Sequence, residues 1–323
     1  MSSRRHRAAA SPVATQARLA ARRHPPVPWA GLGYLLVVYV VWGSTYLAIR
    51  LAVREGAGFP PFSMAAMRIL AAGGLLLLWA AASGRPLRLG RRELAVLAGS
   101  GLLLWVGGNG LVVWAEQRAE SSYAALLVSS APVWVALLEA GLDRRAPSPL
   151  LVASLLVGLG GVALLAAPAL AAGSTVDAAS AGALILAAVT WGLGSVLQRR
   201  QPVSVPPLVS AGYQLLFGAA GLALAALVAR EPLPTPTPEA WAAWGYLVLF
   251  GSLLGFTSYV QVLHLLPTSV AMTYAYVNPA IAVLLGALIL GEAITPWMLG
   301  GMALVLLGVA GVFRDRYRQA ARR

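Results

Sequence analysis

One apolar unit occurs twice in this sequence, and the duplication restricts the fold more than any other feature. Matching residues keep nearly the same spacing along the two copies. Self-similarity over a long period indicates a structural unit that was duplicated. The matching pairs are Val41-Trp42-Gly43 with Thr190-Trp191-Gly192, Pro60-Pro61 with Pro206-Pro207, Pro132 with Pro279, and Ser148-Pro149 with Thr295-Pro296.

The composition places both copies in a lipid bilayer. Hydrophobic residues make up 59% of the chain and charged residues 11%, whereas a soluble domain has about a quarter charged residues. A bilayer core about 30 Å thick requires about 20 apolar residues per helix. Ten segments are predicted to cross it: 29–49, 62–82, 94–115, 122–141, 149–167, 180–198, 208–229, 240–263, 268–290 and 296–313.

Each copy contributes an odd number of these segments, five. The second copy must therefore enter the membrane upside down relative to the first. We predict an all-α integral membrane protein whose ten transmembrane helices form two inverted five-helix repeats. The predicted divisions are a disordered basic tail at 1–28, a first repeat at 29–168, a second repeat at 180–313 and a basic tail at 314–323.

The placement of arginine predicts the orientation. Nineteen arginines lie in the two tails and in the loops after the second, fourth and sixth segments. The opposite side carries Arg50, Arg54, Arg118 and Arg230 together with acids that include Glu55, Glu120, Asp177, Glu231 and Glu239. Positively charged loops stay in the cytoplasm, so both termini are predicted to be cytoplasmic.

Several classes of function lack support in the sequence. The arginines behind the net charge of +13 gather in the tails and loops on one side of the membrane. Membrane topology therefore explains this charge, which does not predict nucleic-acid binding. The chain has no cysteine and three widely separated histidines, which predicts no metal site. No phosphate-binding loop or nucleophile motif is present, so we expect neither an enzyme nor a cofactor.

Arg68 is the most informative polar residue because it is charged and lies inside the second segment. A charged residue costs about 2.5–3.5 kcal/mol at the centre of a membrane helix on insertion scales. Two interpretations stay open: Arg68 binds a carboxylate of the solute, or it holds helix-end carbonyl groups. The equivalent position of the second copy is Gln214, so both copies place a hydrogen-bonding group there.

Two asparagines accompany weak points in the helices. Asn109 lies among three glycines, which permit a bend or a close approach between helices, so it either faces the solute or links two helices. Asn278 precedes Pro279, which frees the carbonyl group of Ala275. Pro132 interrupts the fourth segment at an equivalent depth. These breaks favour a cavity between the copies, although a serine or a neighbouring helix can also satisfy a freed carbonyl.

A tryptophan stands beside a glycine in the first segment of each copy. Aromatic walls with small polar neighbours suit amphipathic metabolites, and helix packing through glycine explains the pattern equally well. The residues predicted to bind solute are Trp42, Tyr46, Arg68, Asn109, Trp191, Gln214, Tyr259, Tyr276 and Asn278.

Acidic residues are expected to be absent from the middle of the membrane. Glu139 and Glu292 are placed near the ends of the fourth and ninth segments. A proton-driven pump for cationic drugs generally needs a buried carboxylate. The sequence therefore disfavours that mechanism.

Three stretches resemble the drug/metabolite transporter superfamily, specifically its ten-helix EamA-type exporters. They are VVWGSTYLAIRLAV at 40–53, PPFSMAAMRIL at 60–70 and LGEAITPWMLGGMALVLLGV at 290–309. The resemblance covers residues 30–313 as two tandem EamA units. It implies a bacterial inner-membrane exporter, and the family's recurring features fall on Trp42, Gly43, Arg68, Pro132, Pro279, Gly291 and Glu292.

We therefore expect a secondary-active exporter that moves small metabolites, amino acids or related amphipathic compounds, by alternating access. A drug or toxic-compound efflux carrier and a passive facilitator or channel stay open as alternatives. The expected partners are a small-molecule solute and the lipid bilayer. The glycine-rich fifth and tenth segments are expected to pack the copies together or to form a homodimer contact.

Overall fold

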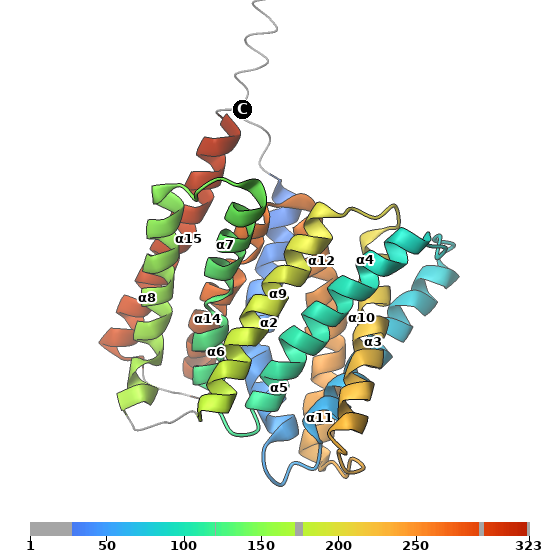
Figure 1. Ribbon diagram of the computed structural model, residues 1–323. Helices are drawn as coiled ribbons and strands as arrows, with labels where there is room; N and C mark the ends of the chain where they lie inside the picture. Colours follow the sequence, from blue (N-terminus) through green and yellow to red (C-terminus); the bar gives the residue numbers. More distant parts are fainter. Residues whose placement is uncertain (1–27, 120, 172–176, 291–293, 322–323) are drawn as a thin grey trace, which may run out of the picture.

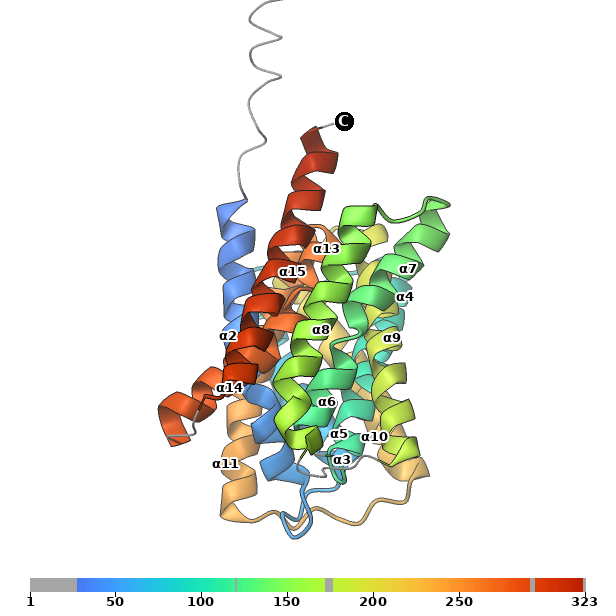
Figure 2. The same ribbon diagram turned by 90° about the vertical axis from the view of Figure 1, so that its left-hand side faces the viewer.

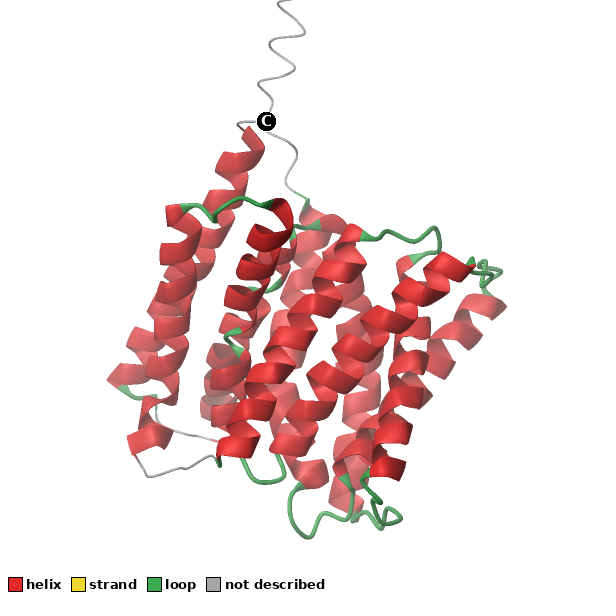
Figure 3. Cartoon of the chain, viewed as in Figure 1, coloured by secondary structure: helices red, strands yellow, loops and turns green. Residues whose placement is uncertain are grey.

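Helices and loops make up all of the protein that the computed structural model describes, residues 28–119, 121–171, 177–290 and 294–321 (Figure 3). Ten helical stretches of these residues are long and apolar enough to cross a membrane. The predicted fold class is thus confirmed. The predicted tail at 1–28 lies outside the described residues except for Pro28, as do Gly291 and Glu292.

The first half of the bundle contains five spans, of which the third and fourth are irregular. The third changes from α- to π-helical geometry and back, and the fourth breaks in two. Its helices are α2 (Trp29–Val53), α3 (Pro61–Ala82), α4 (Arg91–Gly101), the π-helical η1 (Leu102–Gly110), α5 (Leu111–Ala115), α6 (Ser121–Val128), α7 (Ala131–Asp143) and α8 (Pro149–Ala171).

The second half repeats these irregularities in its own third and fourth spans. A π-helical segment at the equivalent place in both halves is consistent with a functional position, where such segments are frequent. The helices are α9 (Ala178–Arg200), α10 (Pro207–Val228), α11 (Pro238–Tyr246), the π-helical η2 (Leu247–Phe256), α12 (Thr257–Leu265), α13 (Thr268–Ala271), α14 (Tyr274–Leu290) and α15 (Pro296–Ala321).

Equivalent helices of the two halves begin with the same chemistry. Proline occupies the first helical position of α8 and of α15, where its missing N–H costs no hydrogen bond. The preceding hydroxyl side chain caps each helix: Ser148 accepts from the amide of Leu151 at 3.0 Å, and Thr295 accepts from that of Met298 at 3.3 Å.

The two halves run in opposite directions. In Figure 1, α2 begins at the upper end of the bundle, whereas α9 begins at the lower end. The start of α2 and the end of α15 lie at the same end, as Figure 2 also shows. We call this the arginine-rich end, because the loops at 83–90, 144–148 and 201–206 lie there, and we call the other end, with the loops at 54–60 and 229–237, the arginine-poor end.

Equivalent helices also pack against each other across the two halves. α3 packs on α10 and α8 packs on α15, while α2 crosses η2 and α9 crosses η1. A methyl group at Gly308 would lie 2.6 Å from the amide nitrogen of Gly158, so the backbones of α15 and α8 touch there. The glycine faces of the fifth and tenth spans thus pack the halves together, and a homodimer stays a prediction.

The break in the fourth span brings the halves together at the centre of the bundle. Ser129 lies between α6 and α7, and its Oγ is 2.5 Å from the carbonyl oxygen of Ala125 and 2.9 Å from that of Ala275. Ala275 is the residue whose carbonyl Pro279 frees. A serine of the first half therefore satisfies the broken helix of the second half.

Candidate functional site

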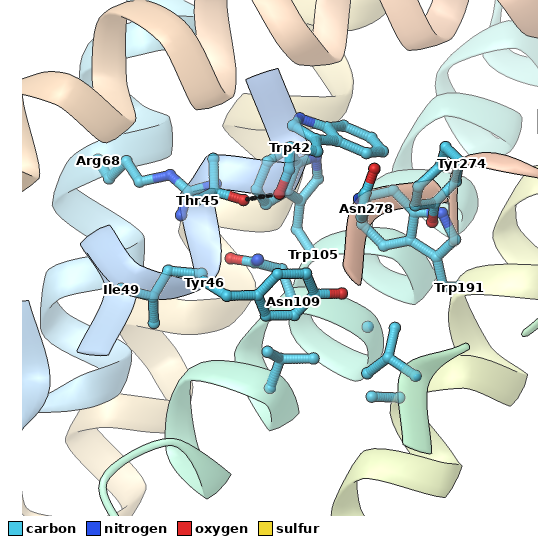
Figure 4. A pocket seen from close by; sticks show the side chains of 14 residues that line it. Trp42, Thr45, Tyr46, Ile49, Arg68, Trp105, Asn109, Trp191, Tyr274 and Asn278 are labelled. Carbon is cyan, nitrogen blue, oxygen red and sulfur yellow. Dashed lines mark hydrogen bonds between the residues drawn. The ribbon is translucent and has the colours of Figure 1, made fainter. Parts of the chain in front are cut away.

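A cavity of about 70 Å³ lies where α2, η1, α9 and α14 meet (Figure 4). Both halves supply its walls, and it begins near the middle of the bundle and extends toward the arginine-poor end. Its lining residues are Trp42, Thr45, Tyr46, Ile49, Arg68, Trp105, Gly108, Asn109, Val112, Val128, Ala187, Trp191, Tyr274 and Asn278.

An aromatic cluster closes the cavity on the side of the arginine-rich end. The ring centre of Trp42 lies 5.4 Å from that of Trp191 and 4.9 Å from that of Tyr274, in both cases edge to face. Both indole nitrogens have partners: that of Trp42 donates to the carbonyl of Gly251 at 3.0 Å, and that of Trp191 donates to the hydroxyl of Tyr259 at 3.1 Å. The cavity therefore has a rigid apolar wall.

Arg68 provides a buried positive charge on the opposite wall, as Figure 4 shows. Its residue is 3% exposed, and its Nε donates to Ser252 at 2.9 Å. The guanidinium carbon lies 5.3 Å from the ring centre of Trp105, a distance that permits a cation–π interaction. Its Nη1 is buried and has no hydrogen-bond partner among the described residues. A donor of this kind at a cavity wall is suited to bind an anion.

Asn109 adds an acceptor to the same cavity. Its Oδ1 is buried and lacks a hydrogen-bond partner within the described part of the chain. Asn278, by contrast, can be engaged: with its amide turned over, its side-chain nitrogen donates to the carbonyl oxygens of Tyr274 at 2.9 Å and Tyr39 at 3.2 Å, which satisfies both ends of the amide. Among the described residues, the cavity thus offers a free cationic donor and a free amide oxygen, which match a zwitterion, and the unpartnered indole nitrogen of Trp105 is a further free donor.

Six of the nine residues predicted to bind solute line this cavity: Trp42, Tyr46, Arg68, Asn109, Trp191 and Asn278. The other three do not. Tyr259 stands behind Trp191, where its hydroxyl also lies 2.6 Å from Ser195 Oγ. Tyr276 points toward α8 and donates to the carbonyl of Leu155 at 3.0 Å.

Gln214 lies apart from the cavity in a polar network near the arginine-rich end. Its Nε2 donates to Ser100 at 2.7 Å and to the side chain of Gln198 at 3.0 Å, which links α10 to α4 and α9. Arg68 lies two turns from the arginine-poor end of α3. Because the two halves are inverted, the equivalent residues Arg68 and Gln214 lie near opposite ends of the bundle.

Sequence reasoning missed two features of this region. Trp105 and Thr45 line the cavity without having been singled out, although Trp105 is three residues before the Gly108-Asn109 pair. Glu116, which follows the third span directly, is 0% exposed. Glu116 lies at the end of the third span rather than in the middle of the membrane, and it is a buried acid that the sequence reasoning did not single out. Within the described residues, no group of three or more His, Asp or Glu side chains could hold a metal ion.

A second, larger hollow of about 690 Å³ opens at the arginine-poor end. The loops after α2, α5 and α10 supply its walls, with Arg54, Arg118 and Arg230 among them. Val53 lines this hollow and Ile49, one turn earlier on α2, lines the central cavity. The two spaces are therefore neighbours along the bundle.

Comparison with known proteins agrees with this architecture. The family model described as "EamA-like transporter family" matches residues 29–167 and again residues 179–314. The chain belongs to the EamA-like transporter family. It is a multi-pass membrane transporter, which confirms the family resemblance noted in the sequence.

Individual relatives cover most of the chain. The "Uncharacterized inner membrane transporter YedA" of Escherichia coli (strain K12) is 32% identical over 292 residues, covering 88% of this chain and 91% of the relative. The "Probable terminal-alkyne amino-acid exporter" of Streptantibioticus cattleyicolor is 27% identical over 292 residues, covering 90% and 94%. One solved structure, described as "Crystal structure of protein", matches with a TM-score of 0.73 at 25% identity and covers 90% of this chain and 98% of that chain.

Proposed function

We propose that this protein is a secondary-active exporter of small metabolites, foremost amino acids, and that it works by alternating access. The observation that carries the proposal is that Nη1 of Arg68 and Oδ1 of Asn109 are buried at the central cavity without a hydrogen-bond partner among the described residues. A solute carboxylate would pair with the guanidinium, and a solute ammonium group would donate to the amide oxygen. The printed name of the Streptantibioticus cattleyicolor relative, an amino-acid exporter, supports the same class of solute.

The remaining cavity residues would select the solute by its shape. The rings of Trp42, Trp191 and Tyr274 would contact the apolar part of the solute. Tyr46 and Asn278 complete the polar rim of the cavity. We assign Tyr259 a positioning role through Trp191, and we assign Gln214 and Tyr276 to helix packing.

The size of the cavity favours a small solute in the described conformation. A volume of about 70 Å³ holds roughly five water molecules when one needs about 10–15 Å³ by this measure. The smallest amino acids are of comparable size. A larger solute would require the walls to separate, as they do when a carrier opens.

The arrangement of the halves supports alternating access. Inverted repeats that meet at a central site can rock against each other and expose the site to one side at a time. At the arginine-rich end, Arg316 of α15 donates to Glu139 of α7 at 3.0 Å and to Ser269 of α13 at 2.5 Å, so both halves are tied together there. We infer that the described conformation is closed at this end and nearer to opening at the other.

Orientation follows from the same two ends. The positive-inside rule would place the arginine-rich end in the cytoplasm of a bacterium, with both termini there. The central cavity would then lie nearer the outer face of the inner membrane. Tags at the two termini that become accessible on opposite faces would contradict this topology and the transport model built on it.

Counterflow in proteoliposomes tests the proposal. Vesicles loaded with unlabelled L-alanine should take up labelled L-alanine with saturation, which a channel does not show. L-alaninamide lacks the carboxylate and should compete poorly. A hydrogen bond to a charged group contributes about 1.5–3 kcal/mol, so the preference for L-alanine should be about tenfold to a hundredfold.

The variant Arg68→Gln should remove most of this preference, and Asn278→Ala should slow counterflow. Arg88→Gln, which removes an exposed arginine from the loop after α3, serves as the matched control and should behave as the wild type. Unchanged rates and an unchanged preference in Arg68→Gln and Asn278→Ala would exclude both residues from the binding site.

A further inference from the structure

Glu116 is a buried acid whose carboxylate has no hydrogen-bond partner among the residues that the structure describes. It follows α5 directly, and it is 0% exposed. Neither carboxylate oxygen has a hydrogen-bond partner among the described residues. Its amide donates to the carbonyl of Val112 at 2.9 Å, and Val112 lines the central cavity. Glu116 therefore lies one helical turn from the cavity, on the side of the arginine-poor end.

The nearest cation, the guanidinium of Arg50, already donates a hydrogen bond to another group. Arg50 of α2 is close enough for its charge to act on Glu116, yet its Nη1 donates to the carbonyl of Ala119 at 2.7 Å. Arg118 lies over the ring of Trp114 and 4.0 Å from Asp177. No ion pair within 4.0 Å joins Glu116 to either arginine.

Part of the surroundings of Glu116 is apolar. Its neighbours Ala115 and Ala119 belong to a cluster with Ala124 and Leu184, which seals the bundle at this depth. The π-helical η1 carries no titratable side chain. The titratable groups on the other elements near α5 are Tyr46 and Arg50 on α2, Arg68 on α3, Tyr123 on α6 and Asp177 before α9.

An ionised carboxylate is unstable in such a place. Removing a charge from water costs several kcal/mol unless a partner compensates, so the group takes up a proton instead. Burial raises the pKa of Glu116 well above its usual range, and the positive charge of Arg50 opposes this shift. Burial therefore favours the neutral form of Glu116.

We propose that Glu116 is the proton-binding site of this transporter and that it exchanges one proton for each solute molecule exported. This inference rests on the proposed function, which it extends by naming the coupling ion. It also reverses the view from the sequence, which found no acid suited to proton exchange.

The exchange needs only groups that are already present. When the halves rock, the O–H bond of the Glu116 carboxyl breaks and the proton passes to water in the central cavity. The guanidinium of Arg50 leaves the carbonyl of Ala119 and pairs with the carboxylate that forms. Tyr46 lies between these groups and the solute, because it lines the cavity and also interacts electrostatically with Glu116. Reprotonation from the arginine-poor side restores the neutral acid.

The test compares accumulation with counterflow. Purified protein is reconstituted into vesicles with an acidic interior, and the membrane potential is clamped at zero. One-for-one exchange should accumulate labelled L-alanine about tenfold for a gradient of one pH unit. Glu116→Gln, which imitates the protonated acid and therefore cannot alternate between proton and solute, should lose both accumulation and counterflow. Glu116→Asp should restore part of the accumulation, and Glu55→Gln, which removes an exposed acid at the same end, should match the wild type.

Infrared difference spectroscopy gives a readout that does not depend on the solute. The wild type at neutral pH should show a protonated-carboxyl band that Glu116→Gln lacks. Wild-type accumulation or wild-type counterflow by Glu116→Gln, failure of Glu116→Asp to restore any accumulation, or an unchanged carboxyl band would each overturn the inference. If the wild type shows no counterflow of L-alanine, the proposed function fails for that solute, and the infrared band still decides whether Glu116 holds a proton.

Discussion

The indole nitrogen of Trp42 in α2 donates to the carbonyl oxygen of Gly251 in η2 at 3.0 Å. This hydrogen bond joins the first span of one half to the π-helical segment of the other. It also holds an aromatic wall of the central cavity in place. The close fit continues one turn further along η2, where a methyl group at Gly255 would lie 2.5 Å from the same indole nitrogen.

Gly255→Ala should therefore impair transport. The added methyl group must displace Trp42 and break its bond to Gly251, and overpacking of this kind costs about 1–3 kcal/mol. We expect the counterflow rate of L-alanine to fall by about tenfold or more. The matched control is Gly245→Ala in α11, where a methyl group meets nothing within 4 Å. Equal rates for the two variants would show that Trp42 need not be held in this position.

A second prediction separates two buried tyrosines of the second half. Tyr259→Phe leaves the indole nitrogen of Trp191 without its acceptor, and Tyr276→Phe removes the hydroxyl that donates to the carbonyl of Leu155. An unsatisfied buried group costs about 1–3 kcal/mol and a lost hydrogen bond about 0.5–1.5 kcal/mol, so both variants should melt at a lower temperature in detergent. Because Trp191 lines the cavity, only Tyr259→Phe should also raise the half-saturating concentration of L-alanine. A similar rise in Tyr276→Phe would contradict the assignment of that residue to helix packing.

The fold followed from the sequence because its causes are local and repeated. Ten apolar runs of sufficient length give ten spans, and an odd number per copy requires inversion. The breaks near Pro132 and Pro279 also follow from local chemistry, since proline cannot complete the helical hydrogen bonds. Ser129 then satisfies the freed carbonyl of Ala275, a pairing across the halves that needs the tertiary structure to be seen.

The site was only partly predictable, because one conformation of an inverted repeat is not symmetric. Arg68 and Gln214 are equivalent in sequence, yet the cavity extends toward the arginine-poor end and reaches only Arg68. Tyr274 faces the cavity and Tyr276 faces α8, a choice fixed by the break before α14 rather than by residue type. Glu116 lies directly after the third predicted segment, 94–115, and nothing in the sequence singles it out. It is buried because the chain turns tightly there, with the amide of Ala119 bonded to the carbonyl of Ala115 at 2.8 Å.

The third prediction concerns the contact that closes the arginine-rich end. Arg316 bonds Glu139 of the first half and Ser269 of the second, and the side chains of Arg316 and Glu139 are only 24% and 21% exposed. Arg316→Gln should weaken this closure and shift the population toward the conformation that is open at the arginine-rich end. Hydrogen bonds to charged groups contribute about 1.5–3 kcal/mol, so the shift in the equilibrium should be about tenfold or more.

Thiol labelling measures this shift directly, because the chain contains no cysteine. Thr45→Cys places one thiol at the wall of the central cavity. A membrane-impermeant reagent supplied from the arginine-rich side should label it faster when Arg316→Gln is also present. Arg88→Gln removes an exposed arginine at the same end and should leave the labelling rate as it is in Thr45→Cys alone. An equal rate with Arg316→Gln would mean that the aromatic cluster around Trp42, not Arg316, keeps this end of the pathway closed.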